Sequence, residues 1–371
     1  MTSCIAQALK VAALDASRKS TRFTITNNTT PPVDSNIISR LLSHYKNSQS
    51  AASMQFPQST NEVNYNPIYQ DWHGFDPSTQ KWSCVDATSS HRSPLTPHAT
   101  GHDTNLVLAT WNIDAGEALP QLRTSAILSH LSSLAPPPDI IFLQEVSRPS
   151  LEFLSGDEGI RQAWFSSEMD SKNWDGHSFA TMTLLSKARF SGRARIGPVW
   201  RVKFQSKFGR DALCCDIFLP SPNLGSTTGE GDEKRIRLVN VHLDSLGIVP
   251  SYRPHQLATV TSSLCSAERG IIAGDFNPVL PEDKTLVEEN GLVDAWQELR
   301  KGDDGFTWGI DGKQAYPPIR MDKVALLGLV ARDIEVMDPG TVVELGPENA
   351  AQGGAVPWSD HSGLRCTFGL A

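Results

Sequence analysis

Five short polar motifs occur in a fixed order along the chain, and four of them directly follow an apolar stretch typical of a buried strand. The motifs are Thr110-Trp111-Asn112-Ile113-Asp114, Leu143-Gln144-Glu145, Asn240-Val241-His242, Gly274-Asp275-Phe276-Asn277 and Ser359-Asp360-His361. Each strand end delivers Asn, Asp, Glu or His. These groups can bind one hard divalent cation and hold a phosphate ester against it. The combination, more than any single motif, predicts a phosphoester-processing site.

Strands and helices alternate from residue 105 onward, which predicts an α/β fold. Apolar residues at helical spacing predict helices over 119–134 and 253–267. The predicted strands are 105–111, 139–143, 179–186, 193–198, 212–219, 235–242, 270–273, 332–337 and 363–368. Because 212–219 and 235–242 are joined by a polar, glycine-rich loop, we expect a hairpin and therefore mixed sheets.

The first hundred residues have a different character. Residues 1–66 are rich in polar residues and proline, and we expect them to be largely disordered. Residues 67–103 carry Trp72, Phe75 and Trp82, which are too apolar for a free linker. We therefore expect this aromatic segment to dock on a catalytic domain spanning 104–371.

Composition restricts the class of protein. The 371 residues are 39% hydrophobic and 20% charged, which is ordinary for a globular protein. No apolar run reaches the roughly 18 residues of a membrane span, and the N-terminus lacks the pattern of a secretory signal. The six cysteines form no CxxC pair. We expect a monomer that does not bind membranes and is nuclear or cytoplasmic rather than secreted.

Glu145 is the first candidate metal ligand. It follows the apolar run 139–143, and Mg²⁺ is usually bound through one or two carboxylates. Asn112 and Asp114 are two residues apart, so in an extended chain they share a side. Alternative interpretations are a surface glutamate after a strand and an Asx turn.

Asp275 and Asn277 repeat the same spacing after a glycine that permits a tight bend. A carboxylate here can deprotonate an attacking water, while the amide binds a phosphate oxygen. His242 and His361 can hydrogen-bond to phosphate oxygens and stabilise transition-state charge. Asp322 is a candidate for orienting a histidine ring. A polar turn and structural histidines are the alternatives.

A basic band spans 187–210. It contains eight basic residues, Arg201, Lys203 and Arg210 among them, and no acidic one, with Trp200, Phe204 and Phe208 interleaved. Such a pattern suits a single-stranded nucleic acid with stacked bases. A sheet rim kept soluble by charge is the alternative, and the sequence leaves both open. The net charge of −8 disfavours non-specific polyanion binding by the whole chain.

The motifs resemble those of the endonuclease/exonuclease/phosphatase superfamily of metal-dependent phosphodiesterases. Besides the five motifs, the resemblance rests on Gly209-Arg210, His242-Leu243-Asp244-Ser245, Phe306-Thr307-Trp308 and Arg320-Met321-Asp322. It covers roughly 104–370 and leaves out the first hundred residues.

The resemblance implies a DNase I-like, four-layer α/β sandwich, in which two packed mixed β-sheets are flanked by helices. It also implies Mg²⁺, with Mn²⁺ as an alternative. The implied metal-site residues are Glu145, Asn112, Asp114 and Asp360. The implied catalytic residues are Asp275, Asn277, His242, His361 and Asp322, the last holding His361. The implied substrate contacts are Ser245, Arg210, Trp308 and Arg320, to which the basic band adds Arg201 and Lys203.

The function that the resemblance implies is Mg²⁺-dependent hydrolysis of phosphoester bonds at DNA ends, with 5′-phosphotyrosyl adducts as a candidate substrate and DNA repair as the setting. A hydrolase acting on RNA or a small phosphorylated molecule is the alternative. A silent binding module is disfavoured because Glu145, Asp275 and His361 are all present. Asp211, Phe276 and Ser362 depart from the most similar branch of the superfamily, which has Asn, Thr and Trp there, so the substrate stays open.

Overall fold

The computed structural model describes residues 66–87, 105–192, 194–220, 233–343 and 355–370. The expected disorder over 1–66 falls, apart from its last residue, outside the described residues. So do residues 88–103 of the aromatic segment and residues 221–232 of the loop that follows 212–219.

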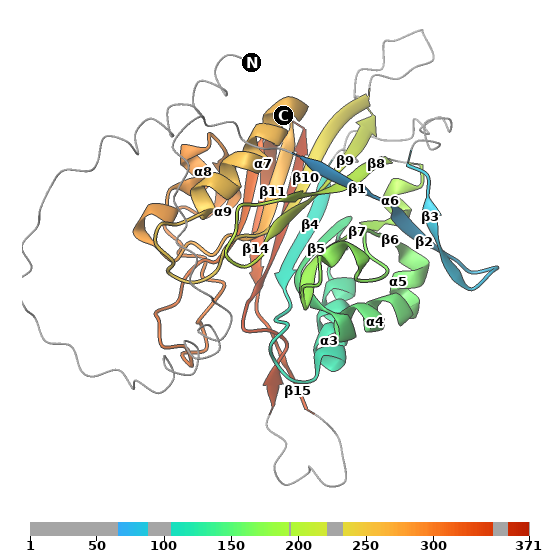
Figure 1. The fold of residues 1–371 in the computed structure, drawn as a ribbon, viewed down its shortest axis with the longest axis horizontal. Helices are drawn as coiled ribbons and strands as arrows, with labels where there is room; N and C mark the ends of the chain where they lie inside the picture. Colours follow the sequence, from blue (N-terminus) through green and yellow to red (C-terminus); the bar gives the residue numbers. More distant parts are fainter. Residues whose placement is uncertain (1–65, 88–104, 193, 221–232, 344–354, 371) are drawn as a thin grey trace, which may run out of the picture. The chain divides into compact units, whose positions relative to one another are not determined.

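Two large sheets form the centre of the described part of the chain (Figure 1). The strands of sheet A, in spatial order, are β1 (Pro67–Gln70), β8 (Arg195–Lys203), β9 (Asp211–Pro220), β10 (Glu233–His242), β11 (Gly270–Asp275), β13 (Asp322–Leu327) and β12 (Val293–Asp294). The strands of sheet B are β14 (Leu329–Met337), β17 (Gly363–Leu370), β4 (Leu106–Asn112), β5 (Ile140–Ser147), β7 (Phe179–Ser186), β6 (Trp164–Ser166), β2 (Trp72–Asp76) and β3 (Lys81–Val85).

Helices flank the sheets, and a small ladder of β15 (Thr341–Val342) and β16 (Val356–Pro357) stands apart. The helices are α3 (Pro120–Ser133), α4 (Arg148–Gly156), α5 (Glu158–Ala163), α6 (Lys187–Phe190), α7 (Arg253–Ala267), α8 (Leu286–Glu289) and α9 (Ala295–Leu299). In Figure 1, α3, α4 and α5 lie on one side of the sheets and α7, α8 and α9 on the other. None of the helices in the described ranges is long and apolar enough to span a membrane.

Alternation of side chains along the strands produces three apolar layers. In β5, Phe142 points into the core between the two sheets, whereas Leu143 packs under the helices α3 and α4. In β10, Leu238 points into the same central core, whereas Val239 packs against α7. The layer order is therefore helices, sheet, sheet, helices, and the predicted four-layer sandwich is confirmed.

The element boundaries follow the sequence pattern closely, with one informative difference. The strand predicted over 193–198 instead spans Arg195–Lys203 as β8. The ladder with β9 shifts register between Ile196 and Val199, and Pro198 lies exposed at this irregularity. A bulge tolerates a residue without an N–H donor, so the strand continues past a proline that normally ends one.

The aromatic segment contributes strands to both sheets. β1 pairs with β8 in sheet A, while β2 pairs with β6 and β3 in sheet B. Trp72 is only 1% exposed in the central core, and its Nε1 donates to Gly197 O of β8 at 2.9 Å. The segment is thus attached by backbone ladders as well as by its aromatic rings.

Two parallel strand pairs place the functional motifs. β4 runs parallel to β5 in sheet B, and β10 runs parallel to β11 in sheet A. Parallel neighbours end at the same edge of a sheet, so Asn112 comes beside Gln144, and His242 pairs with Asp275. The two facing sheets therefore bring four of the five motifs to one edge.

We predict that Trp72→Ala lowers the free energy of unfolding by about 3–5 kcal/mol, because it leaves a large cavity between the sheets. The matched control is Tyr69→Ala in the neighbouring strand. Tyr69 is 67% exposed and touches Trp200 only by a tilted ring contact at 5.8 Å, so its loss should cost about 1 kcal/mol or less. Urea unfolding of both variants provides the measurement, and equal losses would contradict the role given to Trp72.

Candidate active site

A buried pair of amides joins the two sheets beneath the strand ends. Gln144 Nε2 donates to Asn240 Oδ1 at 2.8 Å, and Asn240 Nδ2 donates to the carbonyls of Leu143 and Met182 at 3.2 and 2.9 Å. Both side chains are fully buried. Neither residue was predicted to have a role, although both lie inside the strand-end motifs.

Glu145 leaves the strand ladder just above this pair. The pairing of β5 with β7 shifts register between Leu143 and Val146, and Glu145 has a φ of 56°. A side chain in the left-handed region at a bulge points in a direction that a regular strand does not permit. Glu145 Oε2 accepts from the backbone N of Ala115 at 3.0 Å, and Oε1 accepts from Asn112 Nδ2 at 3.3 Å.

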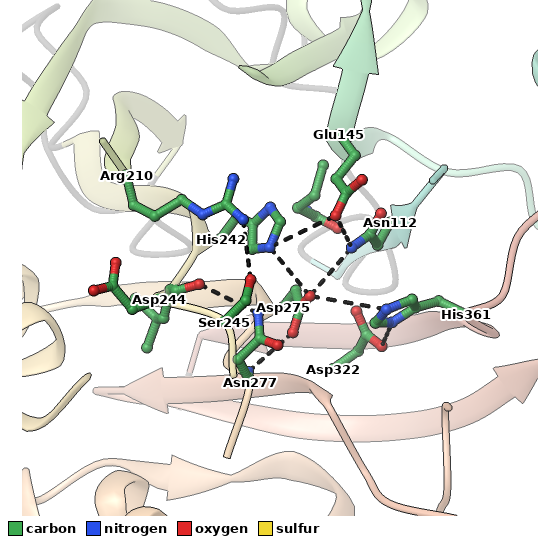
Figure 2. A network of polar contacts seen from close by, with 12 residues as sticks. Asn112, Glu145, Arg210, His242, Asp244, Ser245, Asp275, Asn277, Asp322 and His361 are labelled. Carbon is green, nitrogen blue, oxygen red and sulfur yellow. Dashed lines mark hydrogen bonds and ion pairs between the residues drawn. The ribbon is translucent and has the colours of Figure 1, made fainter. Parts of the chain in front are cut away.

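Asp275 is the centre of the polar network in Figure 2. Its Oδ2 accepts from Asn112 Nδ2 at 3.1 Å and lies 3.4 Å from His242 Nε2 and 3.9 Å from His361 Nε2. Asn112 therefore bridges Asp275 to Glu145. Its own Oδ1 accepts from the backbone N of Asp114 at 3.0 Å, so a direct metal contact by Asn112 stays a prediction.

The environment shifts the pKa values of the two histidines in opposite directions. Burial lowers the pKa of His242 well below its usual value, and the charges of Arg210 and His361 lower it further. Burial would also lower the pKa of His361, but Asp322, Asp275 and Asp360 raise it to about 10. The strongest of these partners is Asp322, whose Oδ2 lies 2.8 Å from His361 Nδ1.

Burial raises the pKa of Asp275 to about 7, and the nearby carboxylates of Asp322 and Glu145 add to the rise. The charge of His361 and a hydrogen bond from the backbone N of Asn277 to Oδ1, at 2.9 Å, oppose it. A carboxylate with this pKa is suited to accept a proton near neutral pH.

Further contacts hold the remaining predicted residues close to the network. Asn277 donates from Nδ2 to Leu243 O at 3.2 Å, and Arg210 Nη2 donates to Ser245 Oγ at 3.0 Å. Trp308 Nε1 donates to Asp360 Oδ2 at 3.0 Å, so Trp308 holds the carboxylate that precedes His361.

A pocket of about 240 Å³ opens beside His242. It is lined by Trp174, His177, Ser178, Phe179, Ala180, Thr181, Phe208, Gly209, Arg210, Asp211 and His242. The Arg210 guanidinium lies 5.0 Å from the centre of the Phe179 ring and 5.7 Å from that of Phe208. The pocket therefore combines flat apolar walls with one cation. Arg210 and His242 in this lining were predicted site residues, whereas residues 174–181 were not, because they form no recognisable motif.

The donor set fits a hard cation that keeps most of its waters. Within the described ranges, no three His, Cys, Asp or Glu residues form a complete metal cage. Mg²⁺ does not need one, since it binds through one or two carboxylates and retains water. Burial, followed by the charges of Asp360 and Glu145, raises the pKa of Asp114. The nearby charge of Arg123 opposes this rise only in part, and a bound cation would supply further positive charge.

Two predicted substrate contacts are wrong. The side chain of Arg201 is 3% exposed and pairs with Glu168 at 2.7 Å and Asp211 at 2.9 Å, so it cannot reach a nucleic acid. Arg320 is also buried, and its Nη1 donates to Asp294 Oδ1 at 2.8 Å. Both guanidiniums support the structure through buried ion pairs.

The other residues of the basic band differ in how exposed they are. Arg195 is buried against Glu233, whereas Lys203 is half exposed and pairs with Asp175 at the surface. Acidic partners from outside the band therefore neutralise much of it. Lys203 and Arg210 remain candidates for substrate contacts.

The comparison with known proteins and the geometry of the site indicate the same class of protein. The model of the Endonuclease/Exonuclease/phosphatase family matches residues 109–361. The chain belongs to this family. The resemblance predicted from the sequence is thus confirmed, and membership supports phosphoester hydrolysis as the class of activity.

Individual relatives point to one branch. The chain is 27% identical over 302 residues to tyrosyl-DNA phosphodiesterase 2 of Homo sapiens, covering 77% of this chain and 74% of that protein. A structure of D. rerio TDP2 with a single-strand DNA product has a TM-score of 0.52 at 20% identity, covering 72% of this chain and all of that one. C. elegans TDP2 has a TM-score of 0.51 at 21% identity, covering 72% and 75%. At these identities the structures show the fold alone.

The pKa of His361 yields a prediction for stability against pH. Its folded value of about 10 exceeds the ordinary 6.5, so the stability from its ion pair is fully present below pH 6.5 and is lost as pH rises towards 10. In EDTA, the gap in melting temperature between the wild type and Asp322→Asn should shrink over this range.

Asp283→Asn is the control for this titration. Asp283 pairs with Arg253, which stays charged. The difference in melting temperature between the wild type and Asp283→Asn should therefore stay constant between pH 6.5 and 10. A constant gap for Asp322→Asn as well would show that His361 does not titrate there.

Proposed function

We propose that this protein is a divalent-metal-dependent phosphodiesterase that hydrolyses 5′-phosphotyrosyl bonds at DNA ends. The observation that carries the proposal is the placement of the Asp275 network directly beside a pocket with aromatic walls and one cation. The similarity to the human protein named tyrosyl-DNA phosphodiesterase 2 and to the D. rerio protein solved with a single-strand DNA product supports the same substrate class.

Asp275 is the proposed general base. With a pKa of about 7 it is substantially ionised at neutral pH and can take a proton from an attacking water. Asn112 and the backbone N of Asn277 each hold one of its oxygens. These contacts fix the direction in which the carboxylate presents its lone pairs.

His361 is the proposed stabiliser of negative charge on the phosphate. Its raised pKa keeps it protonated at neutral pH, and Asp322 fixes its ring through Nδ1. Nε2 is then left to donate to a phosphate oxygen. His242 stays neutral and contributes a hydrogen bond without adding charge.

A divalent cation would be held by Glu145, Asp114, Asn112 and Asp360. When bound, Mg²⁺, or Mn²⁺ in its place, supplies positive charge to the phosphate oxygens as the bond breaks.

The pocket suits an aromatic leaving group. Phe179 and Phe208 offer ring faces, and Arg210 can stabilise a phenolate as it forms. A tyrosine phenol has a pKa of about 10, so it leaves far more readily than an alkoxide and needs little protonation. We further propose that the protein acts as a monomer on single-stranded or end DNA, in the nucleus or cytoplasm, in DNA repair.

The first test offers the purified protein 5′-tyrosyl DNA, abasic DNA, polyadenylated RNA and a soluble phosphomonoester, each with Mg²⁺. Cleavage should be fastest on tyrosyl DNA. Glu145→Ala should lower it by about two orders of magnitude or more, the scale for losing a group that stabilises the transition state. Glu152→Ala, at an exposed position on α4, is the control. Activity that survives EDTA would refute metal dependence, and faster cleavage of RNA or the monoester would refute the substrate.

The pocket can be tested separately with Phe208→Ala. Loss of the ring beneath Arg210 should lower kcat/KM on 5′-tyrosyl DNA about tenfold, near the upper range of a desolvated cation–π contact. A 5′-methyl phosphodiester, which has no ring to bind, should be affected much less. Phe204→Ala is the matched control, because Phe204 lies in the same band but packs against the α7 core. An equal loss on both substrates would remove the aromatic leaving group from the proposal.

A further inference from the structure

Arg123 of α3 is a fully buried cation whose guanidinium uses all five of its N–H donors. Each N–H donates to a backbone carbonyl. Nε donates to Ala118 O at 2.7 Å, Nη1 to Ile113 O and Trp358 O at 2.8 Å each, and Nη2 to Asp114 O at 2.6 Å and Glu117 O at 3.1 Å. Its relative exposure is 1%. This is the fullest use that a guanidinium fork permits.

Four of these carbonyls belong to one turn of the chain, residues 113–118. That turn carries Asp114, and its Ala115 N–H binds Glu145 Oε2 at 3.0 Å. Fixing the carbonyls on one side of the turn therefore also fixes the N–H that aims Glu145. Two predicted metal-site carboxylates depend on this one loop.

The fifth carbonyl belongs to Trp358, just before the Ser359-Asp360-His361 motif. Ser359 Oγ links the same two segments, because it donates to Asn112 O at 2.6 Å. Arg123 thus joins the loop after β4 to the loop before β17, two segments more than two hundred residues apart in sequence. Asp360 is carried on the second loop.

The charge of Arg123 matters as well as its shape. Burial lowers its pKa, but the carboxylates of Asp114, Glu117, Asp360 and Glu145 act in the opposite direction. In return, Arg123 lowers the pKa of Asp114 against burial and the repulsion of Asp360. An internal positive charge beneath the acids reduces the repulsion that would otherwise spread them apart.

We propose that Arg123 is a positioning residue that holds Asp114, Glu145 and Asp360 in the arrangement needed to bind a divalent cation. The inference rests on the metal dependence in the proposed function. Lysine keeps the charge but concentrates three donors on one nitrogen, so it cannot satisfy five carbonyls that surround a planar fork. Arg123→Lys therefore separates geometry from charge.

The test measures metal binding without substrate. Mn²⁺ is titrated into wild type, Arg123→Lys and Arg237→Lys, free Mn²⁺ is followed by electron paramagnetic resonance, and melting temperatures are recorded in EDTA. Arg237 is the matched control, because it is a buried arginine of β10 that pairs with Asp216 and with Ser263 of α7, outside the metal site. Arg123→Lys should weaken Mn²⁺ binding tenfold or more, the scale for removing a partner that orients metal ligands.

Arg237→Lys should bind Mn²⁺ as the wild type does, even where its melting temperature falls. Unchanged Mn²⁺ affinity in Arg123→Lys would overturn the inference. An equal loss in both variants would also overturn it, because general loosening would then be the cause. Wild-type protein that binds Mn²⁺ but leaves 5′-tyrosyl DNA intact would refute only the proposed substrate.

Hydrogen exchange on the wild type tests the same link between the two loops without any substitution. The amide of Ala115 donates to Glu145 Oε2, and the amide of His361 donates to Ser359 Oγ. If Arg123 joins the loops, both amides should exchange through one opening, with the same protection and the same dependence on urea. Independent opening of the two loops would overturn the inference even where Arg123→Lys does not fold.

Discussion

The Gln144–Asn240 hydrogen bond is the contact on which the arrangement of the site most depends. It crosses the centre of the sandwich, one residue before Glu145 on one sheet and two residues before His242 on the other. A buried amide left without its partner costs roughly 1–3 kcal/mol, whereas a one-residue slip of either strand would reverse its faces. The bond therefore fixes the register of one sheet against the other. Glu145 and Asp275 can then be bridged by a single amide, that of Asn112.

Burial shifts the pKa values of His242, His361 and Asp275, yet the outcomes differ because each group has a different partner. His242 and His361 are both buried, but only His361 has a carboxylate at hydrogen-bonding distance from Nδ1. It is therefore charged where His242 is neutral. Asp275 lies between them and titrates near neutral pH. The three different roles proposed for these groups, one base, one cationic donor and one neutral donor, thus follow from their different partners.

The sequence predicted the strand-end motifs because alternation and polar ends are local properties of a strand. It could not predict partners that come from distant segments. Arg201 was wrongly placed on the surface, since its partner Glu168 lies outside the basic band. Arg123 was missed for a related reason. The helical pattern puts Leu122 on the apolar face, yet Leu122 is 46% exposed and Arg123 is buried. A ring of backbone carbonyls gives no signal in the side-chain pattern.

The pocket depends in part on β1, which lies outside the region matched by the family model. Gln70 of β1 donates to Glu168 Oε1 at 2.7 Å, and Arg201 Nη2 donates to the same oxygen at 2.7 Å. Through Nη1, Arg201 then holds Asp211 and Thr181, which both line the pocket. An asparagine at 211 would offer one oxygen and no charge, so the departure to aspartate fits a site with a buried arginine behind it. The predicted metal-site and catalytic residues thus lie on or just beyond the inner strands of the two sheets, while the contacts behind the pocket reach out to the edge strand β1.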